Sequence, residues 1–189
     1  MKWIAALSAF ALASCTTPTT PPRDQFDRLA ALCGTAFEGR IVSPPVAADA
    51  SFAGQRLVMH VRECSPDTIR IPFHVGEDRS RTWVITRTTT GLRLKHDHRH
   101  RDGSEDKLSQ YGGDSTTPPA AARQEFPADA FTKALLAREG NVAGAANIWA
   151  IELDAGTFAY ELRRPGRFFR IDFDLERPVA PPPPPWGSR

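Results

Sequence analysis

The feature that most constrains the fold is a series of short segments in which apolar and polar residues alternate, separated by turn residues. Alternation with a period of two turns one face of each segment toward a core, which predicts β-strands. Connections such as Asp102-Gly103 and Pro165-Gly166 are typical of tight turns, and tight turns make neighbouring strands antiparallel. We therefore predict an all-β fold, an antiparallel meander of about nine strands. The predicted strands are 37–43, 56–63, 68–75, 82–88, 92–101, 107–112, 148–153, 157–163 and 167–174.

A meander of this size must close on itself or leave exposed strand edges. We expect an up-and-down barrel or a strongly curled sheet, similar to lipocalin-like folds in architecture alone. One or two short helices complete the prediction. Asp24 and Asp129 can each cap a helix, and the two helices would end at Gly34 and Gly140.

The first 15 residues have the layout of a secretory leader. A cationic start, Met1-Lys2, precedes an apolar stretch at residues 3–12, which is shorter than the roughly 20 residues that a membrane-spanning helix needs. The chain then reads Leu12-Ala13-Ser14-Cys15, which resembles a bacterial lipobox. The resemblance implies that residues 1–14 form a lipoprotein signal peptide and that an acylated Cys15 anchors the protein in a lipid bilayer.

Thr16 follows this cysteine in place of an aspartate. In enterobacterial lipoproteins such a pattern implies sorting to the outer membrane. We therefore expect a lipid-anchored protein of the bacterial cell envelope, located at the outer membrane and facing the periplasm.

Two proline-rich segments flank the predicted domain. Residues 15–23 read as a proline- and threonine-rich stalk, residues 24–177 as a single β-rich domain, and residues 178–189 as a proline-rich tail. Five prolines begin at Pro181 and are followed by Trp186, a run that favours polyproline II. Three alternatives stay open: a disordered tail, docking of Pro181 to Trp186 on an envelope protein, or packing of Trp186 back onto the domain.

Two cysteines remain once Cys15 is assigned to lipid. An exported protein resides in an oxidising compartment, where an even pair of cysteines usually forms a bridge. We therefore predict a disulfide between Cys33 and Cys64, which would stabilise the fold by about 3–4 kcal/mol through loop closure. A nucleophilic thiol beside a histidine is the alternative, but no flanking motif supports it.

The charge balance argues against one class of partner. The chain has 24 lysines and arginines and 22 aspartates and glutamates. A dedicated nucleic-acid binder would have a basic stripe or a motif of aromatic and basic residues. We therefore expect no nucleic-acid binding.

The segment richest in possible chemistry contains three of the five histidines. On a strand, His96, His98 and His100 share one face with two preceding leucines, so we expect them to extend the core face toward one end of the sheet. Imidazoles two residues apart can bind one transition metal, with His60 or Glu105 as a further ligand. The alternatives are a structural role, a pocket for an organic or anionic ligand, and acid–base catalysis.

The spacing of His98, His100, Glu105 and Gly112 also partly resembles the first cupin motif. The second cupin motif requires a later histidine, and none follows His100.

Four runs of sequence resemble those of small secreted proteobacterial proteins and lipoproteins. These runs are HVGEDRSRTW at residues 74–83, GLRLKHDHRH at 91–100, DGS at 102–104 and YGGD at 111–114. The resemblance implies no activity, cofactor or catalytic residue.

We therefore expect a membrane-anchored binding module, not an enzyme, that holds a small ligand or a metal at the histidine cluster. A structural or protein-interaction lipoprotein that uses its surface and tail is the alternative. A metal-dependent enzyme is a lesser one.

Overall fold

The computed structural model describes residues 24–188, so the leader, Cys15 and the stalk lie outside the described residues. The described chain is mostly β, with two short α-helices and two short 3-10 helices. None of the helices within residues 24–188 has the length and hydrophobicity needed to cross a membrane. The elements are α1 (Gln25–Ala30), β1 (Ala36–Ile41), η1 (Ala47–Asp49), β2 (Leu57–His60), β3 (Glu63–Cys64), β4 (Thr68–Val75), β5 (Asp78–Arg87), β6 (Leu92–His98), β7 (Tyr111–Asp114), β8 (Arg123–Pro127), α2 (Ala130–Arg138), η2 (Val142–Ala146), β9 (Ile148–Leu153), β10 (Thr157–Arg164) and β11 (Arg167–Val179).

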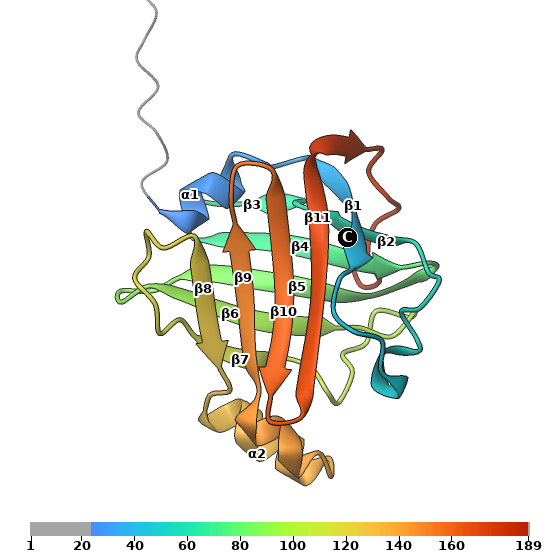
Figure 1. The fold of residues 1–189 in the computed structure, drawn as a ribbon, viewed down its shortest axis with the longest axis vertical. Coiled ribbons are helices and arrows are strands. Elements are labelled where there is room, and N and C mark those ends of the chain that lie inside the picture. Colours follow the sequence, from blue (N-terminus) through green and yellow to red (C-terminus); the bar gives the residue numbers. More distant parts are fainter. Residues whose placement is uncertain (1–23, 189) are drawn as a thin grey trace, which may run out of the picture.

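All eleven strands belong to one antiparallel sheet, in the order β7-β6-β5-β4-β2-β1-β11-β10-β9-β8, with β3 paired to β4. The sheet curls into a nearly closed barrel, in which β8–β11 form a front layer that crosses the strands behind it (Figure 1). The predicted all-β, barrel-like fold is confirmed. The expected nine strands omit β3 and β8, and the strand expected at residues 107–112 is instead β7.

The two ends of the sheet meet at a pair of glycines in β7. The Asp129 backbone amide donates to the Gly112 carbonyl at 3.0 Å, and the Thr132 hydroxyl both accepts from the Gly112 amide and donates to the Gly112 carbonyl. A Cβ on Gly113 would overlap the carbonyl oxygen of Pro127. Only glycine therefore lets β7 approach the end of β8 this closely.

Gly113→Ala should consequently force β7 away from the end of β8. Because the overlap is with backbone rather than with a flexible side chain, we expect the free energy of unfolding to fall by about 3 kcal/mol or more. Chemical denaturation measures the loss. Gly156→Ala is the matched control, since a Cβ there would make only ordinary contacts with Glu176. Equal stability of the two variants would contradict the close approach at Gly113.

Helix α1 covers one end of the barrel. The Asp24 carboxylate caps the helix by accepting from the Asp27 amide, as the sequence predicts, and also pairs with Arg87 of β5. Phe26 and Leu29 are fully buried in the core on the inner side of the helix. This end of the barrel is therefore filled with apolar side chains.

The predicted disulfide is present beside α1. Cys33 and Cys64 are bonded, with their Cα atoms 6.3 Å apart. The Gly34 amide donates to the Val61 carbonyl at 2.7 Å, so the chain that follows α1 is held beside the segment between β2 and β3. The bridge and this hydrogen bond together fix α1 to the sheet.

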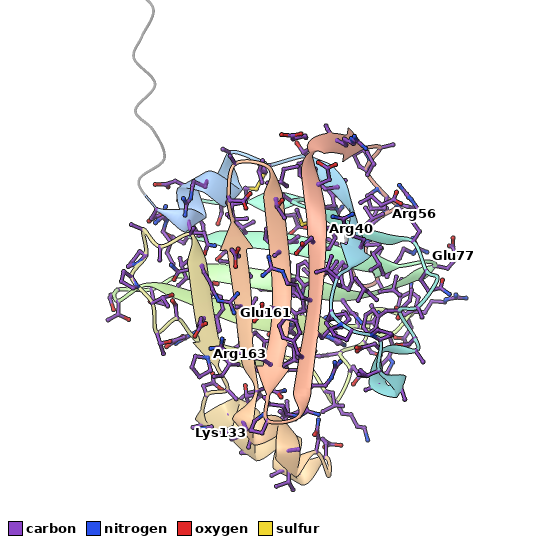
Figure 2. The ribbon with its side chains drawn as sticks, in the orientation of Figure 1. Arg40, Arg56, Glu77, Lys133, Glu161 and Arg163 are labelled. Carbon is purple, nitrogen blue, oxygen red and sulfur yellow. A yellow bond between two sulfur atoms is a disulfide. The ribbon has the colours of Figure 1, made fainter. Side chains whose placement is uncertain are left out.

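The outward-facing side chains of β8–β11 form a network of ion pairs. Glu161 is 5% exposed and accepts from Arg123 at 2.5 Å and from Arg170 at 3.4 Å. The carboxylates around Arg123 raise the pKa of its guanidinium above the ordinary value. Arg163 pairs with Glu125 at 2.7 Å, and Figure 2 shows Glu161 and Arg163 on the visible face of this layer. This ion-pair network therefore lies on the outer face of the layer.

The proline-rich tail folds back on the outer face of the barrel. The Trp186 amide donates to the Arg79 carbonyl at 3.1 Å, and the Arg79 guanidinium donates to the Pro184 carbonyl at 3.3 Å. The Arg101 guanidinium lies over the Trp186 indole, 5.6 Å from its centre. The third alternative for the tail is therefore the one observed, and docking of an envelope protein on this segment stays a prediction.

Removal of the Trp186 side chain should destabilise the fold. The indole is partly buried and lines a cavity together with Pro185, Pro72 of β4 and Thr82 of β5, so Trp186→Ala should lower the free energy of unfolding by about 1–3 kcal/mol. Thermal denaturation measures this change. Pro183→Ala, a substitution at an exposed position of the same segment, should have little effect. Wild-type stability of Trp186→Ala would show that the tail contributes nothing to the fold.

Candidate functional site

A cavity of about 420 Å³ lies at the end of the barrel opposite α1. Its wall is formed by residues of β4–β7, β9–β11 and α2, together with the β6–β7 loop, the segment after η1 and the residues that flank η2. Its lining residues are Phe52, Phe73, Arg81, Trp83, His96, His98, Asp106, Leu108, Tyr111, Leu136, Asn141, Asn147, Trp149, Tyr160, Leu162, Arg164, Arg167 and Phe169. Seven of these 18 residues are Phe, Trp or Tyr, three are Leu, and eight carry polar or charged side chains, so the cavity combines aromatic rings with many polar groups.

Strand alternation places the two predicted histidines in this cavity. His96 and His98 follow Leu92 and Leu94 on the inner face of β6, and both leucines are buried in the core. On the facing layer, Tyr160 of β10 points inward by the same alternation. The expectation that the histidines extend the core face is therefore met for His96 and His98.

Both ring nitrogens of His96 have protein partners. Nδ1 lies 3.0 Å from the Tyr111 carbonyl, to which it must donate, so Nε2 accepts from the Tyr160 hydroxyl at 2.8 Å. The ring is 3% exposed, and burial lowers its pKa to about 3. His96 is therefore a neutral group that fixes the positions of two tyrosines.

His98 lies nearer the opening and makes one ring contact, from Nε2 to the Tyr111 hydroxyl at 3.0 Å. Burial, and then the charge of Arg81 on the neighbouring strand, lower its pKa to about 4. Burial also raises the pKa of Tyr111 to about 12. At neutral pH the histidines and tyrosines of the cavity are therefore uncharged.

The pH dependence of stability should reflect this burial. An unfolded histidine takes up a proton near pH 6.5, whereas His98 stays neutral until about pH 4. The histidine therefore costs no stability above pH 6.5, and lowering the pH from 6.5 to 4 favours the unfolded chain by up to about 3 kcal/mol.

His98→Gln should weaken this loss of stability between pH 6.5 and 4, as measured by urea denaturation across that range. His100→Gln, which removes an imidazole outside the cavity, is the control variant. Identical slopes for wild type and His98→Gln would exclude a buried neutral His98.

The other predicted ligands lie outside the cavity. Strand β6 ends at His98, and the His100 side chain is 57% exposed, with Nε2 3.6 Å from Asp106. Glu105 is 44% exposed and accepts from Ser109 and Gln110. His60 belongs to β2, where the buried neighbours Met59 and Val61 place it on the outer face.

The donor set does not form a metal centre. Among residues 24–188, no group of three or more histidine, cysteine, aspartate or glutamate side chains could hold a metal ion. Both nitrogens of His96 are already bonded within the protein. His96 therefore has a structural role, which is one of the alternatives that the sequence left open.

Stacked aromatic rings form the inner wall of the cavity. The Trp83 ring stacks on Phe73 at 4.9 Å and on Tyr160 at 4.4 Å between ring centres. Trp149 lies 5.4 Å from Tyr111. Sequence reasoning did not select these residues for a site, although their inward positions on predicted strands could have indicated them.

Charged side chains stand at the opening. Three arginines and one aspartate line the cavity: Arg81, Arg164, Arg167 and Asp106. Arg81 pairs with Asp78 at 2.5 Å and Arg167 pairs with the buried Asp49, while Arg164 donates to the Asn147 side-chain oxygen at 2.9 Å. Cationic groups therefore outnumber anionic ones on the surface that faces the cavity.

Comparisons of the chain with protein-family models, with curated proteins and with solved structures found no match.

Proposed function

We propose that the protein is a lipid-anchored binding protein of the bacterial envelope, and that it holds a small organic molecule in the cavity at the open end of its barrel. The lipobox-like sequence that ends in Cys15 supports the anchor. The binding role rests on one observation, the aromatic cavity of about 420 Å³. Ligand sites in proteins are typically concave, predominantly apolar, and have few well-placed polar groups.

The partners of the histidines favour binding over acid–base catalysis. Within the described residues, the rings of His96 and His98 contact only tyrosine hydroxyls and a backbone carbonyl through hydrogen bonds. A catalytic imidazole usually bonds to a nucleophile or to an orienting carboxylate. A rigid wall of neutral polar groups suits recognition of a ligand without conversion.

A neutral fluorescent probe tests this function. N-phenyl-1-naphthylamine is apolar and aromatic, and its emission rises when it leaves water, so it should bind the protein with one-to-one stoichiometry. Leu162→Trp should abolish the signal, because Leu162 lines the cavity and a larger ring fills it. Fluorescence titration measures both affinities.

Val142→Trp is the control, since Val142 is 69% exposed on η2 and an added indole there leaves the cavity open. It should bind the probe like the wild type. Absence of saturable binding, or equal binding by Leu162→Trp, would exclude the cavity as the ligand site.

A further inference from the structure

We propose that the ligand of this cavity is an aromatic carboxylate, and that Arg164 binds its anionic group. This inference rests on the proposed binding function and deepens it by naming the chemical class of the ligand. It follows from the charges at the opening, the free hydrogen-bonding capacity of Arg164 and the distance between Arg164 and the aromatic wall.

Arg164 differs from the other two arginines of the cavity in its partners. The guanidinium groups of Arg81 and Arg167 are neutralised by Asp78 and Asp49, neither of which lines the cavity. The described residues place no carboxylate within 4 Å of the Arg164 guanidinium. Arg164 is therefore the arginine whose charge a ligand can neutralise.

The hydrogen-bonding geometry of Arg164 suits a carboxylate. A guanidinium has five N–H donors in a planar fork, which matches the two oxygens of a carboxylate. The contact to the Asn147 side-chain oxygen uses Nη1 and orients the group, while other N–H donors stay available. Arg164 is only half-buried, so water can solvate its charge when no ligand is bound. The same exposure lets the guanidinium contact an anion at the opening.

The position of Arg164 leaves room for rings between it and the inner wall. Tyr160, Leu162 and Arg164 alternate along β10, and all three line the cavity. Four residues of an antiparallel strand span about 13 Å, so the Arg164 backbone is about that far from Tyr160. Trp83 is 2% exposed and already stacks on Phe73 and Tyr160. A planar aromatic body can instead lie against the partly exposed lining residues Phe52, Tyr111 and Leu162 while its carboxylate points toward Arg164.

Two probes of the same shape test the role of charge. 2-Naphthoate and 2-naphthamide differ in charge at one group, and each can be titrated against bound N-phenyl-1-naphthylamine. The wild-type protein should bind the carboxylate at least about tenfold more tightly than the amide, as expected for a charge-assisted bidentate contact. Arg164→Gln should remove this preference.

Arg163→Gln is the matched control, because it removes the same charge from the neighbouring residue, whose side chain pairs with Glu125 on the outer face. It should keep the full preference for the carboxylate. Arg164→Lys keeps the charge but lacks the planar fork, so its preference for the carboxylate should lie between those of the wild type and Arg164→Gln. This second variant keeps the test usable if Arg164→Gln loses stability.

The outcomes separate the two proposals. Equal binding of carboxylate and amide by the wild type would overturn the ligand class, while binding of the neutral probe would still support the proposed function. An undiminished preference in Arg164→Gln would overturn the role of Arg164. Failure of all three probes to bind would reject the cavity as a binding site.

Discussion

The approach of β7 to β8 is the constraint on which the barrel depends. Ten strands in a continuous path curl until the first and last strands meet, and the meeting point is the backbone of Gly112 and Gly113. Because the seam is made by hydrogen bonds to α2 and its cap instead of a regular ladder, the helix is held directly beside the opening. Closure thus both buries the inner face and shapes the cavity.

The inner face then divides into two regions. Beside α1, the inward side chains are mainly apolar and pack to full burial, as Phe26 and Leu29 show, and Gln124 is a buried polar exception. Beside α2, the inward positions of the strands carry aromatic, histidine and arginine side chains that leave a cavity. The outer arginine–carboxylate network keeps charge on the outside along β8–β11, so the few charges that face inward stand out at the opening.

Much of the fold and part of the candidate site could be predicted from the alternation of apolar and polar residues in the sequence. Alternation predicted most strands, the inward direction of His96 and His98, and a barrel-like sheet, and cysteine counting predicted the Cys33–Cys64 bridge. Strand β8 was missed because its inward Gln124 is polar, and its burial depends on backbone partners at Pro118 and Ala121 that the sequence does not reveal.

The β6–β7 connection was also misplaced. The expected tight turn is present, since the His100 amide donates to the Ser104 carbonyl and Arg99 forms a β-bridge with Glu105. The second strand, however, starts only at Tyr111, after Gln110 adopts a left-handed backbone conformation with φ of 60° and donates its amide to the His96 carbonyl. The cavity itself depends on contacts distant in sequence. Phe52 precedes β2 and Arg164 ends β10, and only the closed sheet brings them to one opening.

The two helices lie at opposite ends of the barrel, so the two ends differ. Asp24, where the described chain begins, caps α1, and Figure 1 shows α1 and α2 at opposite ends of the barrel. The cavity lining includes Leu136 of α2 and no residue of α1. A protein held at a surface through the residues before Asp24 would therefore turn its opening away from the point of attachment. If the proposed ligand binds there, it would enter and leave on the side away from the point of attachment.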